Sequence, residues 1–174
     1  AEEGPEALAA GQKAIELAPD QYMGYTNLCR AYNDMKLYQQ AIKTCNDALK
    51  MQPGDGETNL YLGLAYDRLK QSAAAKDYFK KAITGLNEFT RSNPDYSDGF
   101  YLLGNAYFYS GDDKSAIEAY RKTIELSPRF ARARFNLGAI YFINGKKDLA
   151  QEQYNALKEI DTKIAAELYQ IMNK

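Results

Sequence analysis

The sequence Leu103-Gly104-Asn105-Ala106-Tyr107 is the stretch that decides the fold of this chain. It is followed, at set intervals, by small, aromatic and turn residues, namely Gly111, Ala116, Tyr120 and Pro128. The same order of residue types returns in other copies that start at Leu28, Leu62 and Leu137. The chain is therefore built from an internal repeat, and a repeat array grows by stacking one unit on the next instead of enlarging one core.

The distance between copies identifies the kind of repeat. The copies at Leu103 and Leu137 lie 34 residues apart, and each carries Leu-Gly, a tyrosine, a small alanine and a second aromatic residue in that order. This pattern resembles the tetratricopeptide repeat, a helix-turn-helix unit of about 34 residues. In the copy at Leu28, Cys29 stands where the others carry glycine, and Cys45 stands where they carry a ring. The resemblance covers nearly the whole chain.

The resemblance implies an all-α fold, a right-handed α-solenoid of antiparallel helix hairpins. We predict a single array over residues 1–174, in which four hairpins lie between a leading half-repeat and a C-terminal capping helix. The predicted bounds are residues 5–19 for the leading half-repeat helix, 22–55 for repeat 1, 56–96 for repeat 2, 97–130 for repeat 3, 131–164 for repeat 4 and 163–174 for the capping helix. The leading helix lacks a partner helix, so another surface is needed to cover its apolar face.

Repeat 2 is seven residues longer than its neighbours, and the extra residues fall in its second helix. Seven residues are almost two helical turns, so the insertion displaces the apolar stripe by only ~20°. The stripe continues through Ile83, Leu86 and Phe89. We predict one long helix from about residue 72 to residue 91 that projects past the body of the array, although Gly85 within it costs about 1 kcal/mol relative to alanine. The alternative is a shorter helix followed by an ordered loop at residues 90–94.

The turn inside each repeat is occupied by Gly111 in repeat 3 and by Gly145 in repeat 4. Glycine is favoured there because the residue that ends a helix often has a positive φ angle. Repeats 1 and 2 carry Lys36 and Lys70 instead, and lysine tolerates a positive φ less well. We therefore expect the turns of repeats 1 and 2 to differ in shape from those of repeats 3 and 4.

The two cysteines, Cys29 and Cys45, lie on the packed sides of the paired helices of repeat 1. We expect both to be small buried thiols that behave as hydrophobic residues. The alternative is a disulfide bond within the hairpin, which requires a suitable separation of the two Cα atoms.

Composition argues against several classes of function. The chain has no histidine, which removes Ser-His-Asp and Cys-His catalytic pairs as well as histidine ligands for a metal. A net charge of -1 with interspersed signs argues against a nucleic-acid partner. No run approaches the ~18 apolar residues of a membrane span, and no signal-peptide pattern opens the sequence. We expect a soluble, non-catalytic protein without cofactor, metal or membrane insertion; its compartment stays open.

The resemblance implies a role in binding proteins. In a superhelix of stacked hairpins, the first helix of each repeat lines the concave wall, and its outward positions face a groove. From those positions we predict a site for a peptide or partner helix, which consists of Asn27, Arg30, Tyr61, Tyr101, Asn105, Phe108, Tyr109, Arg132, Phe135 and Asn136. Aromatic residues gather toward the C-terminal part of this set, and exposed aromatic anchors usually mark an interface.

Asn105, Arg132 and Asn136 are the predicted polar contacts of the groove. The resemblance implies that asparagines at these positions hold the backbone or carboxylate of a ligand, and the adjacent Arg132 adds charge-assisted hydrogen bonds. The family's clamp for chaperone tails needs a lysine at a position that is filled here by Thr26, Leu60 and Tyr101. We therefore predict a less specific groove and not a heat-shock chaperone clamp. Two further groove positions, Phe142 and Ile143, have packing under the capping helix as an alternative role.

Two other functions remain as alternatives. The unpaired leading helix and the projecting helix of repeat 2 both offer apolar surface, so the chain is also a candidate for self-assembly into a homo-oligomer. The second alternative is that the chain is the interaction arm of a larger enzyme.

Overall fold

The computed structural model describes residues 3–173, which form α-helices joined by short turns. The helices in these residues are α1 (Glu3–Leu17), α2 (Tyr22–Asp34), α3 (Tyr38–Met51), α4 (Gly56–Arg68), α5 (Ser72–Ser92), α6 (Ser97–Ser110), α7 (Asp113–Leu126), α8 (Ala131–Ile143), α9 (Lys147–Lys158) and α10 (Thr162–Met172). The prediction of an all-α fold is confirmed. No helix in this range combines the length and the apolar character that crossing a membrane requires.

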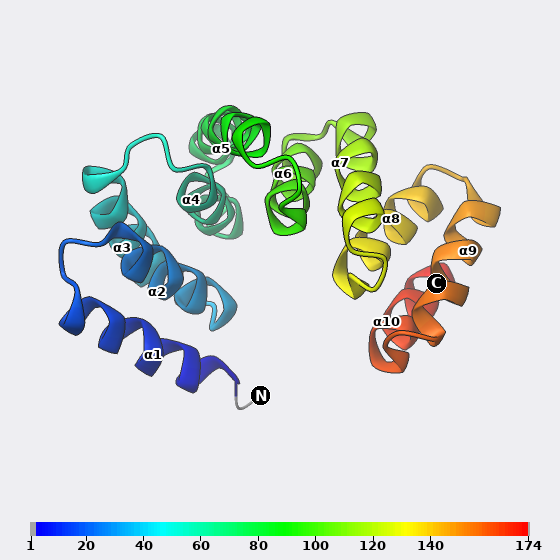
Figure 1. Cartoon of the computed structure of the whole chain (residues 1–174), viewed down its shortest axis with the longest axis horizontal. Coiled ribbons are helices and arrows are strands. Elements are labelled where there is room, and N and C mark those ends of the chain that lie inside the picture. Colours follow the sequence, from blue (N-terminus) through cyan, green and yellow to red (C-terminus); the bar gives the residue numbers. More distant parts are fainter. Residues whose placement is uncertain (1–2, 174) are drawn as a thin grey trace. The chain divides into compact units, whose positions relative to one another are not determined.

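The helices belong to two compact units that divide between Phe89 and Thr90, near the end of α5. In the first unit, α1 packs against α2, α2 against α3, and α4 against both α2 and α3 (Figure 1). In the second unit, α6 pairs with α7 and α8 pairs with α9, while α10 packs against α8 and α9. Within each unit, helices that follow one another in the sequence are thus neighbours in space. The division into repeats stays a prediction.

The Leu-Gly element of the repeat allows two helices to approach closely around a buried side chain. A Cβ atom on Gly63 would lie 2.7 Å from the ring of Phe79, and one on Gly104 would lie 2.6 Å from the ring of Tyr120. Both rings are buried in the core. Because non-bonded carbon atoms do not approach so closely, any larger residue at these two positions would push the paired helices apart.

In the first hairpin, a disulfide bond between Cys29 of α2 and Cys45 of α3 takes the place of this contact. Both cysteines are fully buried, and their Cα atoms are 5.3 Å apart. The expectation of two free thiols is therefore wrong, and the alternative of a disulfide within the hairpin is confirmed. The physical reason lies in the other repeats: the glycine and the ring face each other across the hairpin, so cysteines at these two positions meet at bonding distance.

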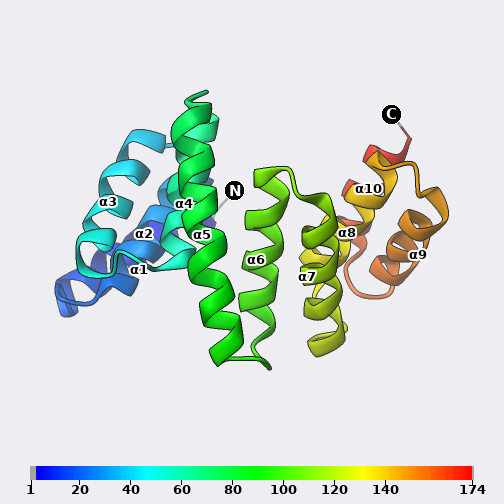
Figure 2. The same ribbon diagram turned by 90° about the horizontal axis from the view of Figure 1, so that it is seen from above.

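Helix α5 runs unbroken from Ser72 to Ser92, where the sequence predicted a helix over residues 72–91, and it lies beside α4 (Figure 2). The prediction that its extra turns project outward is wrong at Leu86 and Thr90, which are both buried. A Cβ atom on Gly85 would collide with the carbonyl oxygen of Gly54, and one on Gly56 would lie 2.6 Å from the backbone nitrogen of Leu86. Glycine occupies position 85 because the backbone of α5 rests directly on the turn before α4.

The turns inside the hairpins have one shape, contrary to the expectation that lysine would alter it. The φ angles are 61° at Lys36 and 62° at Lys70, against 88° at Gly111 and 74° at Gly145, so all four residues are left-handed. In each turn, the residue that follows the left-handed one donates its backbone N–H to the backbone carbonyl of the recurring tyrosine in the helix before the turn. These bonds, of 2.8 to 3.0 Å, join Leu37 to Tyr32, Gln71 to Tyr66, Asp112 to Tyr107 and Lys146 to Tyr141. The helix-ending hydrogen bonds thus impose a positive φ whatever the residue.

Replacement of Lys36 or Lys70 by glycine is expected to stabilise the first unit by about 0.5–1 kcal/mol each. The left-handed conformation costs an L-residue about 1–2 kcal/mol, and glycine avoids this cost. Part of the gain is offset because glycine loses more conformational entropy on folding than lysine does. Urea unfolding followed by circular dichroism measures the change. Gly111→Lys in the second unit is the reverse control and should lose a similar amount. A lower unfolding midpoint for Lys36→Gly would contradict the explanation.

Each terminal helix packs against its neighbours on one side. In α1, a Cβ atom on Gly11 would lie 3.0 Å from Leu28 of α2, so the apolar side of α1 faces α2. At the other end, the Asp161 side chain accepts hydrogen bonds from the backbone N–H groups of Lys163 and Ile164, both at 3.0 Å, and caps the N-terminus of α10. The fully buried Leu168 of α10 then packs on α8.

Candidate partner-binding site

The second unit brings Asn105 of α6 and Asn136 of α8 together through Tyr120 of α7. Oδ1 of Asn105 accepts hydrogen bonds from Oη of Tyr120 at 2.7 Å and from Nδ2 of Asn136 at 3.0 Å. Nδ2 of Asn136 also donates to Oη of Tyr120 at 3.2 Å. Burial raises the pKa of the Tyr120 phenol, so the hydroxyl stays protonated and remains a donor. The buried tyrosine therefore holds both asparagines in one orientation.

This network determines which amide atoms remain available to a ligand. Within the described range 3–173, Nδ2 of Asn105 donates no hydrogen bond to another residue, and Oδ1 of Asn136 accepts none. Both side chains are half-buried. One donor and one acceptor, held on adjacent first helices of two hairpins, match the C=O and N–H groups that an extended peptide backbone offers.

Phe108 and Tyr109 form an exposed aromatic pair near the end of α6. Their side chains are 37% and 36% exposed, and their ring centroids are 5.3 Å apart in an edge-to-face arrangement. Ile143 at the end of α8 is 67% exposed, so the alternative that it packs under α10 is wrong. Phe142 is half-buried and packs against a core cluster that α7, α8 and α9 form. The second unit thus presents apolar surface on the helices that carry the two asparagines.

Three predicted site residues make contacts within the second unit. Tyr101 packs against the ring of Phe130, with centroids 4.9 Å apart. Phe135 is half-buried and packs against the cluster formed by α9 and α10, so it is the residue that lies under the capping helix. Arg132 pairs with Glu167 of α10 at 3.2 Å. Because both partners of this ion pair are largely exposed, the pair contributes little, and a ligand carboxylate can replace Glu167 at small cost.

The first unit brings Arg30 of α2 and Tyr61 of α4 together. Oη of Tyr61 donates to Oε1 of Glu57 at 3.0 Å, and the electrostatic interaction of Arg30 with Tyr61 and Glu57 shows that the three groups are close together. Burial raises the pKa of Tyr61, and the carboxylate of Glu57 raises it further. Burial alone lowers the pKa of Arg30, but Tyr61, Glu57 and Asp34 outweigh it, so the pKa is raised and the guanidinium stays charged.

The remaining predicted residue, Asn27, is exposed on α2. The predicted site residues therefore form two local groups: Asn27, Arg30 and Tyr61 in the first unit and the other seven in the second. Tyr120 and Glu57 were absent from the prediction although they orient its members. The sequence signal that could have identified Tyr120 is its hydroxyl group, because the equivalent aromatic residue of repeat 2, Phe79, has none.

Among residues 3–173, no group of three or more His, Cys, Asp or Glu residues is placed to hold a metal.

Comparison with protein families explains the repeated hairpins. The tetratricopeptide-repeat model matches residues 24–55, 57–84 and 131–164, and a TPR-repeat model matches residues 104–145. The first of these models alone accounts for more than half of the chain. The chain belongs to the tetratricopeptide-repeat family.

Three known proteins resemble this tetratricopeptide-repeat chain to different degrees. BBSome complex member BBS4 of Bos taurus is 29% identical over 123 residues, which are 71% of this chain and 22% of that relative. The chain thus spans about a fifth of the relative's length. The solved structure of TTC0263, a thermophilic TPR protein of Thermus thermophilus, aligns over 98% of this chain and 91% of its own with a TM-score of 0.76 and 21% identity. YrrB, described as a TPR protein with an unusual peptide-binding site, aligns over 95% and 81% with a TM-score of 0.57 and 25% identity.

Proposed function

We propose that this tetratricopeptide-repeat protein is a non-catalytic interaction module that binds a segment of a partner protein along the first helices of its repeats. Membership of the family, the similarity to a peptide-binding TPR protein and the similarity to a member of a multiprotein complex all support a scaffold for protein interactions. The observation that carries the finer proposal is the asparagine network of the second unit, which leaves one donor and one acceptor unpaired.

An extended peptide suits this network better than a partner helix. The backbone N–H and C=O groups of a helix are already bonded to each other, whereas an extended strand leaves them free for Asn105 and Asn136. Apolar side chains of the ligand would then pack on Phe108 and Tyr109, and Arg132 would receive an acidic group of the ligand in exchange for Glu167. Self-assembly has less support, because α1 lies on α2 and α5 is buried at Leu86 and Thr90.

A test starts with a peptide selected from a random displayed library against the purified chain. Asn136→Ala removes the free acceptor but leaves the bond between Tyr120 and Asn105 in place, and we expect it to weaken peptide binding about tenfold. The double variant Phe108→Ala, Tyr109→Ala removes the exposed aromatic surface and should weaken it at least tenfold as well. Isothermal titration calorimetry measures both, after circular dichroism has shown that each variant folds.

The matched control is Tyr169→Ala, which removes an aromatic side chain of the same unit that is 53% exposed on α10. It should leave the affinity unchanged within about twofold. If the Asn136 and Phe108–Tyr109 variants bind the peptide as tightly as this control, the first helices are not the binding surface.

A further inference from the structure

The disulfide bond between Cys29 and Cys45 lies at the centre of the core of the first unit. Both side chains are 0% exposed, and they form one buried cluster with Leu62 and Ala65 of α4. Sγ of Cys45 lies 3.5 Å from the carbonyl oxygen of Thr58, so α4 contacts the bond directly. The chain has two cysteines and therefore no third thiol that could exchange with this bond.

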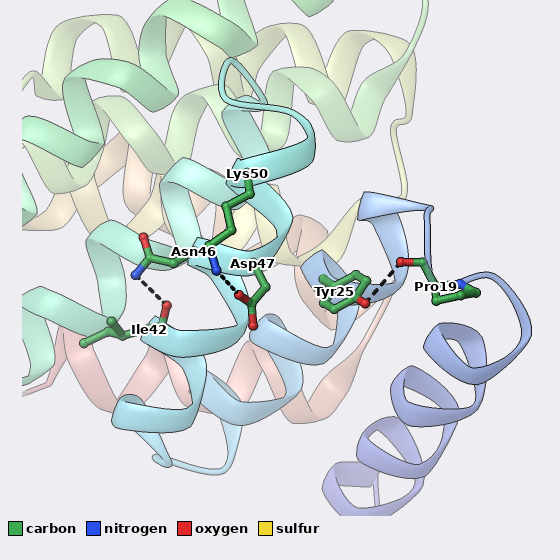
Figure 3. A network of polar contacts seen from close by, with 6 residues as sticks. All are labelled: Pro19, Tyr25, Ile42, Asn46, Asp47 and Lys50. Carbon is green, nitrogen blue, oxygen red and sulfur yellow. Dashed lines mark hydrogen bonds and ion pairs between the residues drawn. The ribbon is translucent and has the colours of Figure 1, made fainter.

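No side-chain hydrogen bond or ion pair joins α2 to α3 in the part of the chain that the structure describes. The polar contacts of α3 in Figure 3 stay inside that helix. Nδ2 of Asn46 donates to the carbonyl of Ile42 at 2.9 Å, and Nζ of Lys50 pairs with Asp47 at 2.6 Å. Tyr25 of α2 donates to a carbonyl in the turn before α2. The hairpin is therefore held by its turn, by apolar packing and by the disulfide.

The two cysteines replace a pair of residues that fills this place in the hairpins of α4 with α5 and of α6 with α7. The equivalent pair is a glycine and a buried aromatic ring, namely Gly63 with Phe79 and Gly104 with Tyr120. The side chains of two cysteines together have fewer non-hydrogen atoms than one such ring. As free thiols they would pack this place less completely, and incomplete packing of a core is destabilising. The covalent bond offsets this loss only where the thiols are oxidised.

The burial of the disulfide decides between a regulatory and a structural role. A disulfide is reduced by a thiolate that attacks one of its sulfur atoms, so its reduction requires access to that atom. Both sulfur atoms are covered, and a reductant reaches them only when the helices around them separate. Disulfides of reducing compartments are usually transient and catalytic or redox-sensing, whereas a bond that staples a core is typical of proteins in oxidising compartments.

We propose that this protein works in an oxidising compartment, outside the reducing cytosol, with the bond between Cys29 and Cys45 as a permanent part of its structure. The bond forms when the thiolate of one cysteine attacks the disulfide of a protein thiol oxidase, and the second cysteine then displaces this enzyme from the mixed disulfide. The chain gives up two electrons and two protons, and the oxidase leaves as a dithiol. The compartment is independent of the proposed function, because binding through the second unit needs no disulfide.

Differential alkylation in the cells that produce the native protein tests the proposal. The cells are quenched in acid and denatured, free thiols receive a first label, and thiols released by reduction then receive a second label. Mass spectrometry reads both labels at Cys29 and Cys45. We expect at least about tenfold more of the second label than of the first at both residues, because the buried bond stays closed.

Fractionation of the same cells before labelling locates the protein. It should accompany a marker of exported proteins and not a marker of the cytosol. Native protein that carries mainly the first label would overturn the proposal, and so would native protein in the cytosolic fraction, whichever label it carries.

A matched variant tests the reason given for the bond. Cys29→Gly, Cys45→Phe restores the glycine and the ring of the later hairpins and cannot form a disulfide. Both chains are produced in a bacterium with and without an added export signal. The parent chain should accumulate several-fold less than the variant in the cytosol and equally in the periplasm, because loss of stability lowers abundance in cells.

Circular dichroism checks that this variant folds, and the alkylation result stands without it. Equal accumulation of the two chains in the cytosol would show that the hairpin does not need the bond and would overturn the proposal.

Discussion

Reduction of the disulfide between Cys29 and Cys45 is expected to lower the free energy of unfolding of the first unit by about 3 kcal/mol. The bond joins residues 16 apart in sequence, and opening a loop of this length returns that much conformational entropy to the unfolded chain. The effect is large for a domain, whose stability is only about 5–15 kcal/mol in total. The hairpin of α2 and α3 should therefore be the part of the chain that responds most strongly to reductant.

Urea unfolding with and without a phosphine reductant measures this effect on the same chain, so that no residue has to be substituted. Alkylation followed by mass spectrometry shows that the disulfide is present before reduction and absent after it. The double variant Cys29→Ala, Cys45→Ala is the control, because its unfolding midpoint should not respond to the reductant. An unchanged midpoint for the fully reduced native chain would contradict the expected stabilisation.

Replacement of Gly85 by alanine is expected to destabilise the first unit by about 2–3 kcal/mol, although alanine is favoured over glycine in a helix by about 1 kcal/mol. The added methyl group would collide with the backbone of Gly54 and Gly56. Backbone cannot rotate away as a flexible side chain can, so α5 would have to separate from the turn before α4, and Leu86 would lose its packing there.

The control for this substitution is Gly54→Ala in the same contact region. Nothing lies within 4 Å of a Cβ atom built on Gly54, so this variant should stay within about 0.5 kcal/mol of the parent chain. Thermal and urea unfolding measure both variants. Stabilisation of Gly85→Ala by about 1 kcal/mol, as helix propensity alone predicts, would show that α5 does not rest on the turn.

The contrast between Gly85 and Gly54 shows which features of the fold a local sequence pattern can predict and which it cannot. Helix propensity describes Gly85 as a cost within α5, and the sequence predicted the extent of that helix closely. The packing of its extra turns depends on the turn at Gly54–Gly56, which precedes it in the chain by a whole helix. A pattern within one helix contains no information about a surface supplied by another.

The candidate site likewise has some features that the sequence predicts and others that only the tertiary structure determines. The positions of Asn105, Phe108, Tyr109 and Asn136 on the first helices follow from the repeat, because residues at the same place in each copy share a face. The free donor and acceptor of the two asparagines do not follow from it, because they depend on hydrogen bonds made by Tyr120 from a third helix. The packing of Phe135 against α10 and the ion pair of Arg132 with Glu167 also depend on which helices pack together.

The sequence by itself determined the family and the all-α fold, since Leu-Gly, tyrosine and alanine at fixed intervals specify helices that can pack only on helices of the same kind. Tertiary structure alone decided two other features: the bond between Cys29 and Cys45 and the close contact at Gly85. Both depend on distances between backbones that are far apart in the sequence. Such distances are set by the packing of whole surfaces, so that one added atom decides between a favourable contact and a collision.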